Sequence, residues 1–150
     1  MASTAKSLAT NADTHRVRAD CQEFIARFYH YLDGREYEPL SVLFAPEGLW
    51  SRQGKQLHGP VAVLEELRRR PATMVTRHVV SNLIVDIQDT QHVHVQCYVT
   101  LYYSDTGAPP QSPVRMTGPA CVFTYHDELV ATEGTWRITR KWSSTDFSAV

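Results

Sequence analysis

Residues 76–85 read Thr-Arg-His-Val-Val-Ser-Asn-Leu-Ile-Val, and this stretch predicts that the second half of the chain forms β-strands. Side chains alternate between the two faces of a β-strand, so His78, Val80, Asn82 and Ile84 are expected to share one face. The other face is also largely apolar, which predicts a sheet covered on both sides. Further strands with similar alternation are predicted over residues 92–104, 114–126 and 135–146.

Helical spacing dominates the first half of the chain. Apolar side chains recur at helical intervals from Thr14 to Leu32. Two shorter helices are predicted, one through residues 37–44 and one that opens at Gly59-Pro60, where proline suits the first turn. A hairpin that turns at Gln53-Gly54 separates them. Helices followed by hairpin-connected strands predict an α+β fold, with the helices on one face of a mainly antiparallel sheet.

Length and composition restrict the class of protein. The 150 residues suffice for one domain, predicted over residues 14–146 behind a flexible tail of residues 1–13. A formal charge of −1 argues against nucleic acid or an anionic membrane as partner, and no stretch has the ~20 apolar residues of a membrane span. The 3 cysteines show no Cys-x-x-Cys spacing, which predicts free thiols and a cytoplasmic protein. We predict neither a cofactor nor a metal, because fingerprints for phosphate loops, dinucleotides and serine nucleophiles are absent from the sequence.

One constellation of polar residues could carry chemistry. Tyr29 precedes Asp33 by one helical turn, and His78 and Asn82 share a strand face. We expect these four side chains, with Trp50 from the hairpin, to line one otherwise apolar cavity. Asp33 would accept a hydrogen bond from one imidazole nitrogen and leave the other for a substrate, since imidazole transfers protons near neutral pH. The alternative is a core histidine and an aspartate that only shapes the end of the helix.

The order of elements, together with residues 44–59 (Phe-Ala-Pro-Glu, Trp50 and Gly59) and residues 77–82, resembles the nuclear transport factor 2-like superfamily. More narrowly, it resembles the SnoaL-like branch, which includes polyketide cyclases, scytalone dehydratase and the small subunits of ring-hydroxylating dioxygenases. The resemblance implies a cone, in which a strongly curved sheet wraps three N-terminal helices and leaves an apolar pocket at the wide end. It also implies a homodimer or homotrimer, in line with an outer sheet face that carries Tyr98 and Tyr102.

A gap-free comparison with the scytalone dehydratase pattern places Asp33 and His78 on that family's aspartate and first catalytic histidine. Other positions of the pattern hold different residues, namely Leu32, Arg52, Tyr103, Val122 and Thr124. The lost tyrosines at Leu32 and Arg52 argue against scytalone-like dehydration itself. The strand faces and the resemblance together predict that Tyr29, Trp50, Val80, Asn82, Tyr103 and Val122 bind a substrate.

The sequence and the resemblance together favour a cofactor-independent dehydratase, isomerase or cyclase. It would act on a small, apolar, oxygenated ring compound, with His78 as general base and then acid, and Asp33 orienting it. Two alternatives stay open: a non-catalytic small subunit that accompanies a larger oxygenase chain, and a ligand-binding module. A pocket filled by Trp50, Tyr29 or Tyr103 would favour the subunit. An open cavity with His78 in contact with Asp33 would favour the enzyme.

Overall fold

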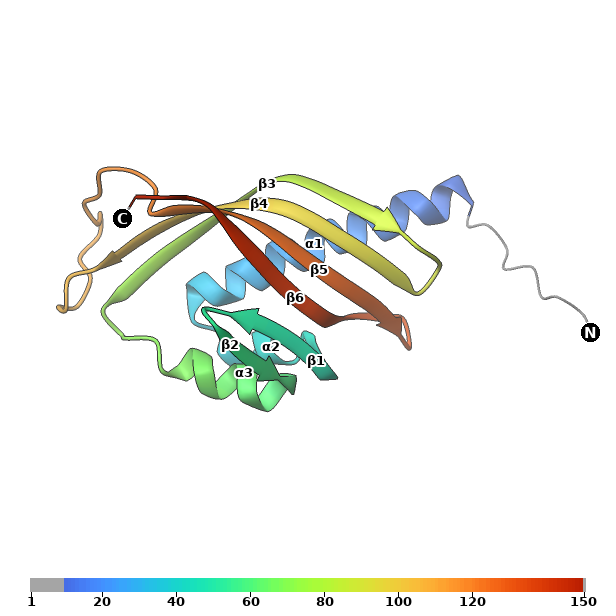
Figure 1. The fold of residues 1–150 in the computed structure, drawn as a ribbon, viewed down its shortest axis with the longest axis horizontal. Coiled ribbons are helices and arrows are strands. Elements are labelled where there is room, and N and C mark those ends of the chain that lie inside the picture. Colours follow the sequence, from blue (N-terminus) through green and yellow to red (C-terminus); the bar gives the residue numbers. More distant parts are fainter. Residues whose placement is uncertain (1–9, 150) are drawn as a thin grey trace, which may run out of the picture.

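The computed structural model describes residues 10–149 and has the predicted α+β architecture (Figure 1). In chain order the elements are α1 (Asn11–Gly34), α2 (Tyr37–Ser41), β1 (Phe44–Arg52), β2 (Lys55–His58), α3 (Gly59–Arg68), β3 (Met74–Ile87), β4 (His92–Asp105), β5 (Cys121–Thr132) and β6 (Thr135–Ser148). The strands form one sheet in the order β2-β1-β6-β5-β4-β3. All neighbours pair antiparallel except β1 and β6, which are parallel.

The long strands β3 to β6 arch over α1, and β1, β2, α2 and α3 gather below them in the view of Figure 1. The apolar stripe of α1 faces the inside of this curve, where Phe28 meets the edge of Trp50 from β1 at a centroid distance of 5.5 Å. Val95 and Val99 from β4 and Ile138 from β6 are fully buried in the same core. Because α1 is held in the concave side of the sheet, its last turn lies against β3.

Helix α1 begins at Asn11, three residues earlier than the sequence analysis placed it. Thr10 and Asp13 form a reciprocal cap: the Asp13 backbone N–H donates to the Thr10 hydroxyl and the Thr10 backbone N–H donates to the Asp13 carboxylate, both at 3.2 Å. Residues 11–13 of the predicted flexible tail are therefore helical. Residues 1–9 of that tail lie outside the described residues. Within residues 10–149, no helix is both long and apolar enough to cross a membrane.

Other predicted boundaries are wrong as well, among them the following two. The second helix ends at Ser41, and Phe44 opens β1, because the Leu43 carbonyl accepts a hydrogen bond from the Ile138 backbone N–H and draws the chain into the sheet. Strand β5 begins at Cys121 instead of Val114. Pro119 has no backbone N–H to donate to a ladder, so pairing with β4 can start only beyond it.

A bulge in β3 changes which side chains point inward. Pairing with β4 shifts between Ser81 and Ile84, where Asn82 has a left-handed φ of 49°. Asparagine adopts this conformation more readily than most residues. Beyond the bulge the alternation is reversed, so Ile84 is 57% exposed while Val85 is buried. The predicted common face of His78, Asn82 and Ile84 is therefore wrong beyond Val80.

Candidate active site

The predicted contact between Asp33 and His78 is confirmed. Asp33 lies in the last turn of α1, and His78 lies on β3 ahead of the bulge. The His78 Nδ1 is 2.6 Å from Asp33 Oδ1, and the His78 backbone N–H donates to Asp33 Oδ2 at 2.8 Å. Both side chains are only about a tenth exposed (10% and 11%). The Asp33 carboxylate thus accepts two hydrogen bonds from His78, which fixes the imidazole relative to the end of α1.

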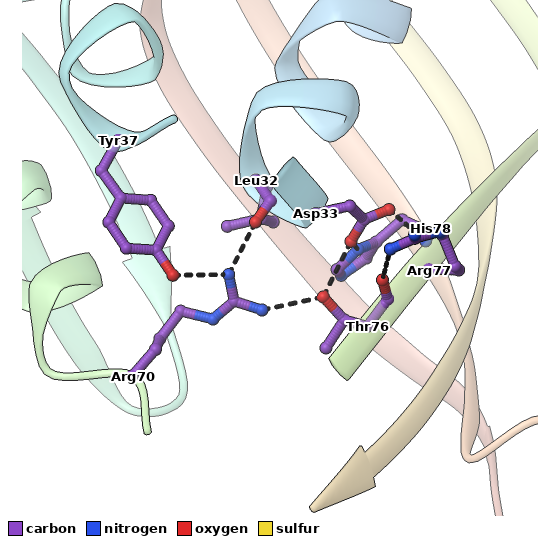
Figure 2. Close-up of polar contacts among 7 residues, drawn as sticks. All are labelled: Leu32, Asp33, Tyr37, Arg70, Thr76, Arg77 and His78. Carbon is purple, nitrogen blue, oxygen red and sulfur yellow. Dashed lines mark hydrogen bonds and ion pairs between the residues drawn. The ribbon is translucent and has the colours of Figure 1, made fainter. Parts of the chain in front are cut away.

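A chain of hydrogen bonds through Thr76 and Arg70 supports this pair (Figure 2). The Thr76 hydroxyl donates to Asp33 Oδ1 at 2.8 Å, and Arg70 Nη2 donates to the Thr76 hydroxyl at 2.8 Å. Arg70 Nη1 donates to the Leu32 carbonyl at 2.7 Å and to the Tyr37 hydroxyl at 3.1 Å. Because Arg70 can only donate, it turns the Thr76 proton toward Asp33.

The carboxylate of Asp33 remains ionised in this setting. Burial by itself raises the pKa of Asp33, but the hydrogen bonds and charge of His78 and the hydroxyl of Thr76 outweigh burial, and the net pKa is lowered. An ionised Asp33 accepts from Nδ1–H and so selects the tautomer in which Nε2 carries a lone pair. No residue of the described chain bonds to Nε2, which leaves it for a ligand.

His78 separates two hollows. The first is a cavity of about 320 Å³ between β1 and the concave face of β3 to β6, and His78, Trp50 and Tyr103 line it. This volume lies at the lower end of the range for small-molecule sites. On the other side of His78, a groove of about 420 Å³ runs between α1 and β3, and Tyr29, Asp33 and Val80 line it.

The structure thus distributes the six residues predicted to bind a substrate over three places. Trp50 and Tyr103 lie in the cavity, and Val80 lies in the groove. Tyr29 also borders the groove, although its ring is buried and stacks on His78 at a centroid distance of 5.2 Å. The other two residues line neither hollow: Asn82 is exposed at the bulge, and Val122 lies outside both linings.

On β5 it is Phe123 and Tyr125, the residues of the opposite parity to Val122, that line the cavity. Strand β5 starts later than predicted, but the burial of Leu129 on the same strand gives the inward parity directly. Alternation counted back from Leu129 would have found both aromatic residues. Arg52 and Arg70 also line the cavity, and neither was among the residues predicted to bind a substrate.

A buried ion pair lies beneath the site and was not predicted. Lys141 from β6 and Asp127 from β5 are fully buried, and the Lys141 ammonium lies 2.9 and 3.0 Å from the two carboxylate oxygens. It also donates to the Tyr29 hydroxyl at 3.4 Å. Burial raises the pKa of Asp127, and Lys141 acts against that rise. Through Tyr29, this pair supports the ring on which His78 stacks.

The outer sheet face carries aromatic side chains. His94 and His126 stack on each other and on Trp142, with His94 Nε2 and His126 Nδ1 3.1 Å apart, and Tyr98 is 43% exposed. Among the described residues, no group of three or more histidine, cysteine, aspartate or glutamate side chains is arranged to hold a metal ion.

The cysteines allow a first prediction. Burial raises the pKa of Cys21 to about 12 and that of Cys97 to about 11, and both thiols are fully buried, whereas Cys121 is partly exposed. At pH 8 we expect an aromatic disulfide reagent to modify Cys121 alone in the native protein and all three thiols in denaturant, because the thiolate is the reacting form. Cys121→Ser should abolish the native signal. Rapid native labelling of that variant would contradict the buried positions of the other two.

The fold and this site together define a cone-shaped α+β protein in which a hydrogen-bonded histidine–aspartate pair lies beside a cavity. The sequence matches the SnoaL-like domain family over residues 13–141, so the chain belongs to that family. No curated protein sequence matches the chain significantly.

Solved structures share the fold at low sequence identity. A protein assigned as a scytalone dehydratase from Novosphingobium aromaticivorans has a TM-score of 0.79 at 17% identity, covering 93% of this chain and 91% of that chain. The hexachlorocyclohexane dehydrochlorinase LinA-type3 from Novosphingobium barchaimii has a TM-score of 0.78 at 15% identity, covering 93% of each chain. A protein with a cystatin-like fold from Nostoc punctiforme has a TM-score of 0.69 at 18% identity, covering 86% of this chain and 90% of that one.

Proposed function

We propose that this protein is a cofactor-independent enzyme that moves protons on a small, largely apolar, oxygenated ring compound, as a dehydratase, isomerase or cyclase. One observation carries the proposal: the His78 ring is bound by Asp33 at 2.6 Å through Nδ1 while it lines a cavity of about 320 Å³. A histidine that only fills the core would not border an open cavity with its second nitrogen unbonded.

The chemistry follows from the tautomer that Asp33 selects. Nε2 of His78 takes a proton from a carbon next to a substrate carbonyl, and the C–H electron pair moves into an enolate. The imidazolium that forms is stabilised by the Asp33 carboxylate at 2.6 Å. Returning the proton to another carbon completes an isomerisation. Giving it to a departing hydroxyl on the neighbouring carbon breaks the C–O bond and releases water, which completes a dehydration.

The names of two structural neighbours support a reaction of this type. Dehydration and dehydrochlorination are both eliminations in which carbon loses a proton, and proteins assigned to these activities share this fold. The identities of 17% and 15% carry no substrate over to this chain. The predicted homodimer or homotrimer is proposed on the family resemblance alone.

The test uses a substrate that reports proton removal without knowledge of the natural compound. In 5-nitrobenzisoxazole a base removes the one acidic C–H proton, the N–O bond breaks, and a coloured cyanophenolate forms. We expect the wild-type protein to accelerate this ring opening with saturation, and His78→Ala to return the rate to that of buffer. His92→Ala is the matched control, because the His92 imidazole also binds an aspartate, Asp89, at 2.9 Å but is exposed.

The same measurement separates the enzyme from its alternatives. If the wild type binds the compound but gives no saturable acceleration, the cavity belongs to a ligand-binding module. An unchanged rate in His78→Ala would mean that another group acts as the base. Co-purification with an iron-containing oxygenase chain, together with an inactive cavity, would support the small-subunit alternative.

A further inference from the structure

The wall of the cavity is positively charged. Two arginines, Arg52 from β1 and Arg70 from the segment after α3, line it together with His78, and no aspartate or glutamate does. Asp33 contacts His78 from the groove side and lines the groove instead. The occupant of the cavity is therefore expected to bring negative charge.

Arg52 has no close carboxylate of its own. Its side chain is only 18% exposed, and its nearest acidic partner, Glu66, lies 3.9 Å from Nη1. The same Glu66 oxygen already binds the Lys55 ammonium at 2.7 Å, and the other oxygen lies 3.5 Å from Arg69. One carboxylate shared among three cations leaves the guanidinium of Arg52 undercompensated. Burial is the main cause that lowers the pKa of Arg52, and the charge of Arg70 acts in the same direction.

Arg52 nevertheless holds a defined position. The guanidinium lies over the Trp50 ring at 5.4 Å, and Nη1 donates to Gln53 Oε1 at 3.1 Å. A guanidinium has five N–H donors in a planar fork. Within the described chain this single hydrogen bond engages Arg52, so most of the fork is left for a ligand.

Arg70 adds a second positive charge, which is linked to the ionised Asp33 only through the hydroxyl of Thr76. Its terminal nitrogens donate to neutral oxygens of Leu32, Tyr37 and Thr76, and no carboxylate of residues 10–149 lies within ion-pair distance. The Arg70 Nε–H and the Trp50 indole N–H are both buried without a hydrogen-bond partner in the described chain. Beside Arg70 and Trp50, two buried donors are therefore left without an acceptor.

We propose that the cavity binds a substrate that carries a carboxylate, with Arg52 as the residue that receives it. A planar carboxylate matches the guanidinium fork and places one negative charge against one undercompensated positive charge. The remaining, apolar part of the substrate lies along Trp50 and Phe123 toward His78. As a substrate assignment this rests on the proposed proton-transfer function. The carboxylate site itself requires no turnover.

Arg52 and Arg70 also fit the reaction proposed for His78. Loss of a proton from carbon creates negative charge in the cavity, and positive groups fixed in place before the reaction stabilise it. The carboxylate would hold the ring in one orientation, so that one carbon faces the imidazole. Arg52 is in this view a binding and orienting residue, whereas His78 is the catalytic one.

The test compares two ring compounds of the same shape, 2-naphthoate and its uncharged amide, 2-naphthamide. Binding is measured by isothermal titration calorimetry at low ionic strength. We expect the wild type to bind the acid roughly 10- to 100-fold more tightly than the amide, as charge-assisted hydrogen bonds imply. Arg52→Met should reduce this preference to about one while amide affinity changes little, and Arg52→Lys should keep part of it.

Arg140→Met is the matched control, because Arg140 also lies over a tryptophan ring, that of Trp142 at 4.7 Å, but does not line the cavity. It should leave the preference unchanged. Equal binding of acid and amide by the wild type, or failure of the acid to bind at all, overturns the proposal without reference to any variant. A preference that survives in folded Arg52→Met overturns the role of Arg52.

His78→Ala keeps the two proposals apart. If the carboxylate site is right, this variant retains the preference for the acid whether or not His78 is the base. If the acid preference persists and ring opening of 5-nitrobenzisoxazole never depended on His78, only the catalytic proposal fails. If ring opening depends on His78 and acid and amide bind equally, only the carboxylate site fails.

Discussion

Lys141→Met is expected to lower the free energy of unfolding by about 3–5 kcal/mol, the usual cost of leaving one partner of a buried ion pair alone. Lys141 and Asp127 are both 0% exposed and face each other directly on β5 and β6. Methionine fills nearly the same space as lysine but offers no donor. Asp127 would then remain in the core with neither a charge partner nor water.

The geometry explains why the effect should be large. All three protons of the Lys141 ammonium have acceptors, namely the two oxygens of Asp127 and the hydroxyl of Tyr29. The ammonium also lies within 5.1 Å of the ring centroids of Phe28, Tyr29 and Tyr125. Removal of the lysine therefore breaks hydrogen bonds and cation–π contacts in a region that water does not reach.

Urea unfolding measures the change, and thermal unfolding should show a midpoint roughly 6–20 °C lower for a chain of this length. The matched control is Lys55→Met, which removes an ion pair of similar length, 2.7 Å to Glu66, from a lysine that is 53% exposed. It should cost less than about 1 kcal/mol.

The double variant Asp127→Leu with Lys141→Met should recover most of the loss, since a well-packed apolar pair often equals a buried ion pair. A cost below about 1 kcal/mol for Lys141→Met would contradict a buried, unsolvated pair.

Much of the scaffold was predictable because it depends on repeating patterns. The helical stripe of α1, the hairpin at Gln53-Gly54 and the alternation of β3 and β4 each identified their elements. These features depend on spacing along single elements. The contact between Asp33 and His78 joins two elements, and it was predicted from the resemblance to the scytalone dehydratase pattern together with the spacing of polar residues.

The features that were missed depend on local departures from spacing. The bulge at Asn82 reverses the alternation within one strand, and nothing in residues 76–85 marks it except an asparagine. A second irregularity, between Glu128 and Leu129, shifts the register of β6. Buried residues there are Ile138 and Lys141, three apart, so simple alternation could not place the lysine inward.

Charged cavity residues were hidden by their surroundings in the sequence. Arg70 belongs to a run of three arginines that reads as the basic end of a helix, yet Arg68 binds the exposed Glu38 while Arg70 turns inward to Thr76. Arg52 next to the Gln53-Gly54 turn resembles any exposed hairpin residue. Only the curvature of the sheet, which closes β1 toward β3, brings them to one cavity.

Asp33→Asn is expected to reduce ring opening of 5-nitrobenzisoxazole by about 10²–10⁴-fold, the range in which positioned proton transfer contributes. Asp33 accepts three hydrogen bonds, from the His78 backbone N–H, His78 Nδ1 and the Thr76 hydroxyl. Asparagine offers one acceptor oxygen and places an NH₂ group where the second oxygen was. If that NH₂ faces Nδ1, the imidazole must take the opposite tautomer, and Nε2 becomes a donor that cannot remove a proton.

Three further results would separate this role from a merely structural one. The double variant Asp33→Asn with His78→Ala should be no slower than His78→Ala alone, because residues that act as a unit are not additive. Affinity for 2-naphthoate should change little, since Arg52 is untouched. Asp89→Asn, which alters the exposed pair with His92, should leave the rate unchanged.

The free energy of unfolding at acid pH gives an independent check on the Asp33 carboxylate. Because the pKa of Asp33 is lowered below its usual value of 3.8, the stability that its ionised form supplies is present above about pH 4. It is lost as the pH falls through the lowered value, when the folded state must take up the proton. Asp33→Asn should therefore lose less stability than the wild type between about pH 4 and pH 2. If both lose stability in parallel over that range, the carboxylate is not held as an ion by His78 and Thr76, and the tautomer on which the proposed base depends would have no support.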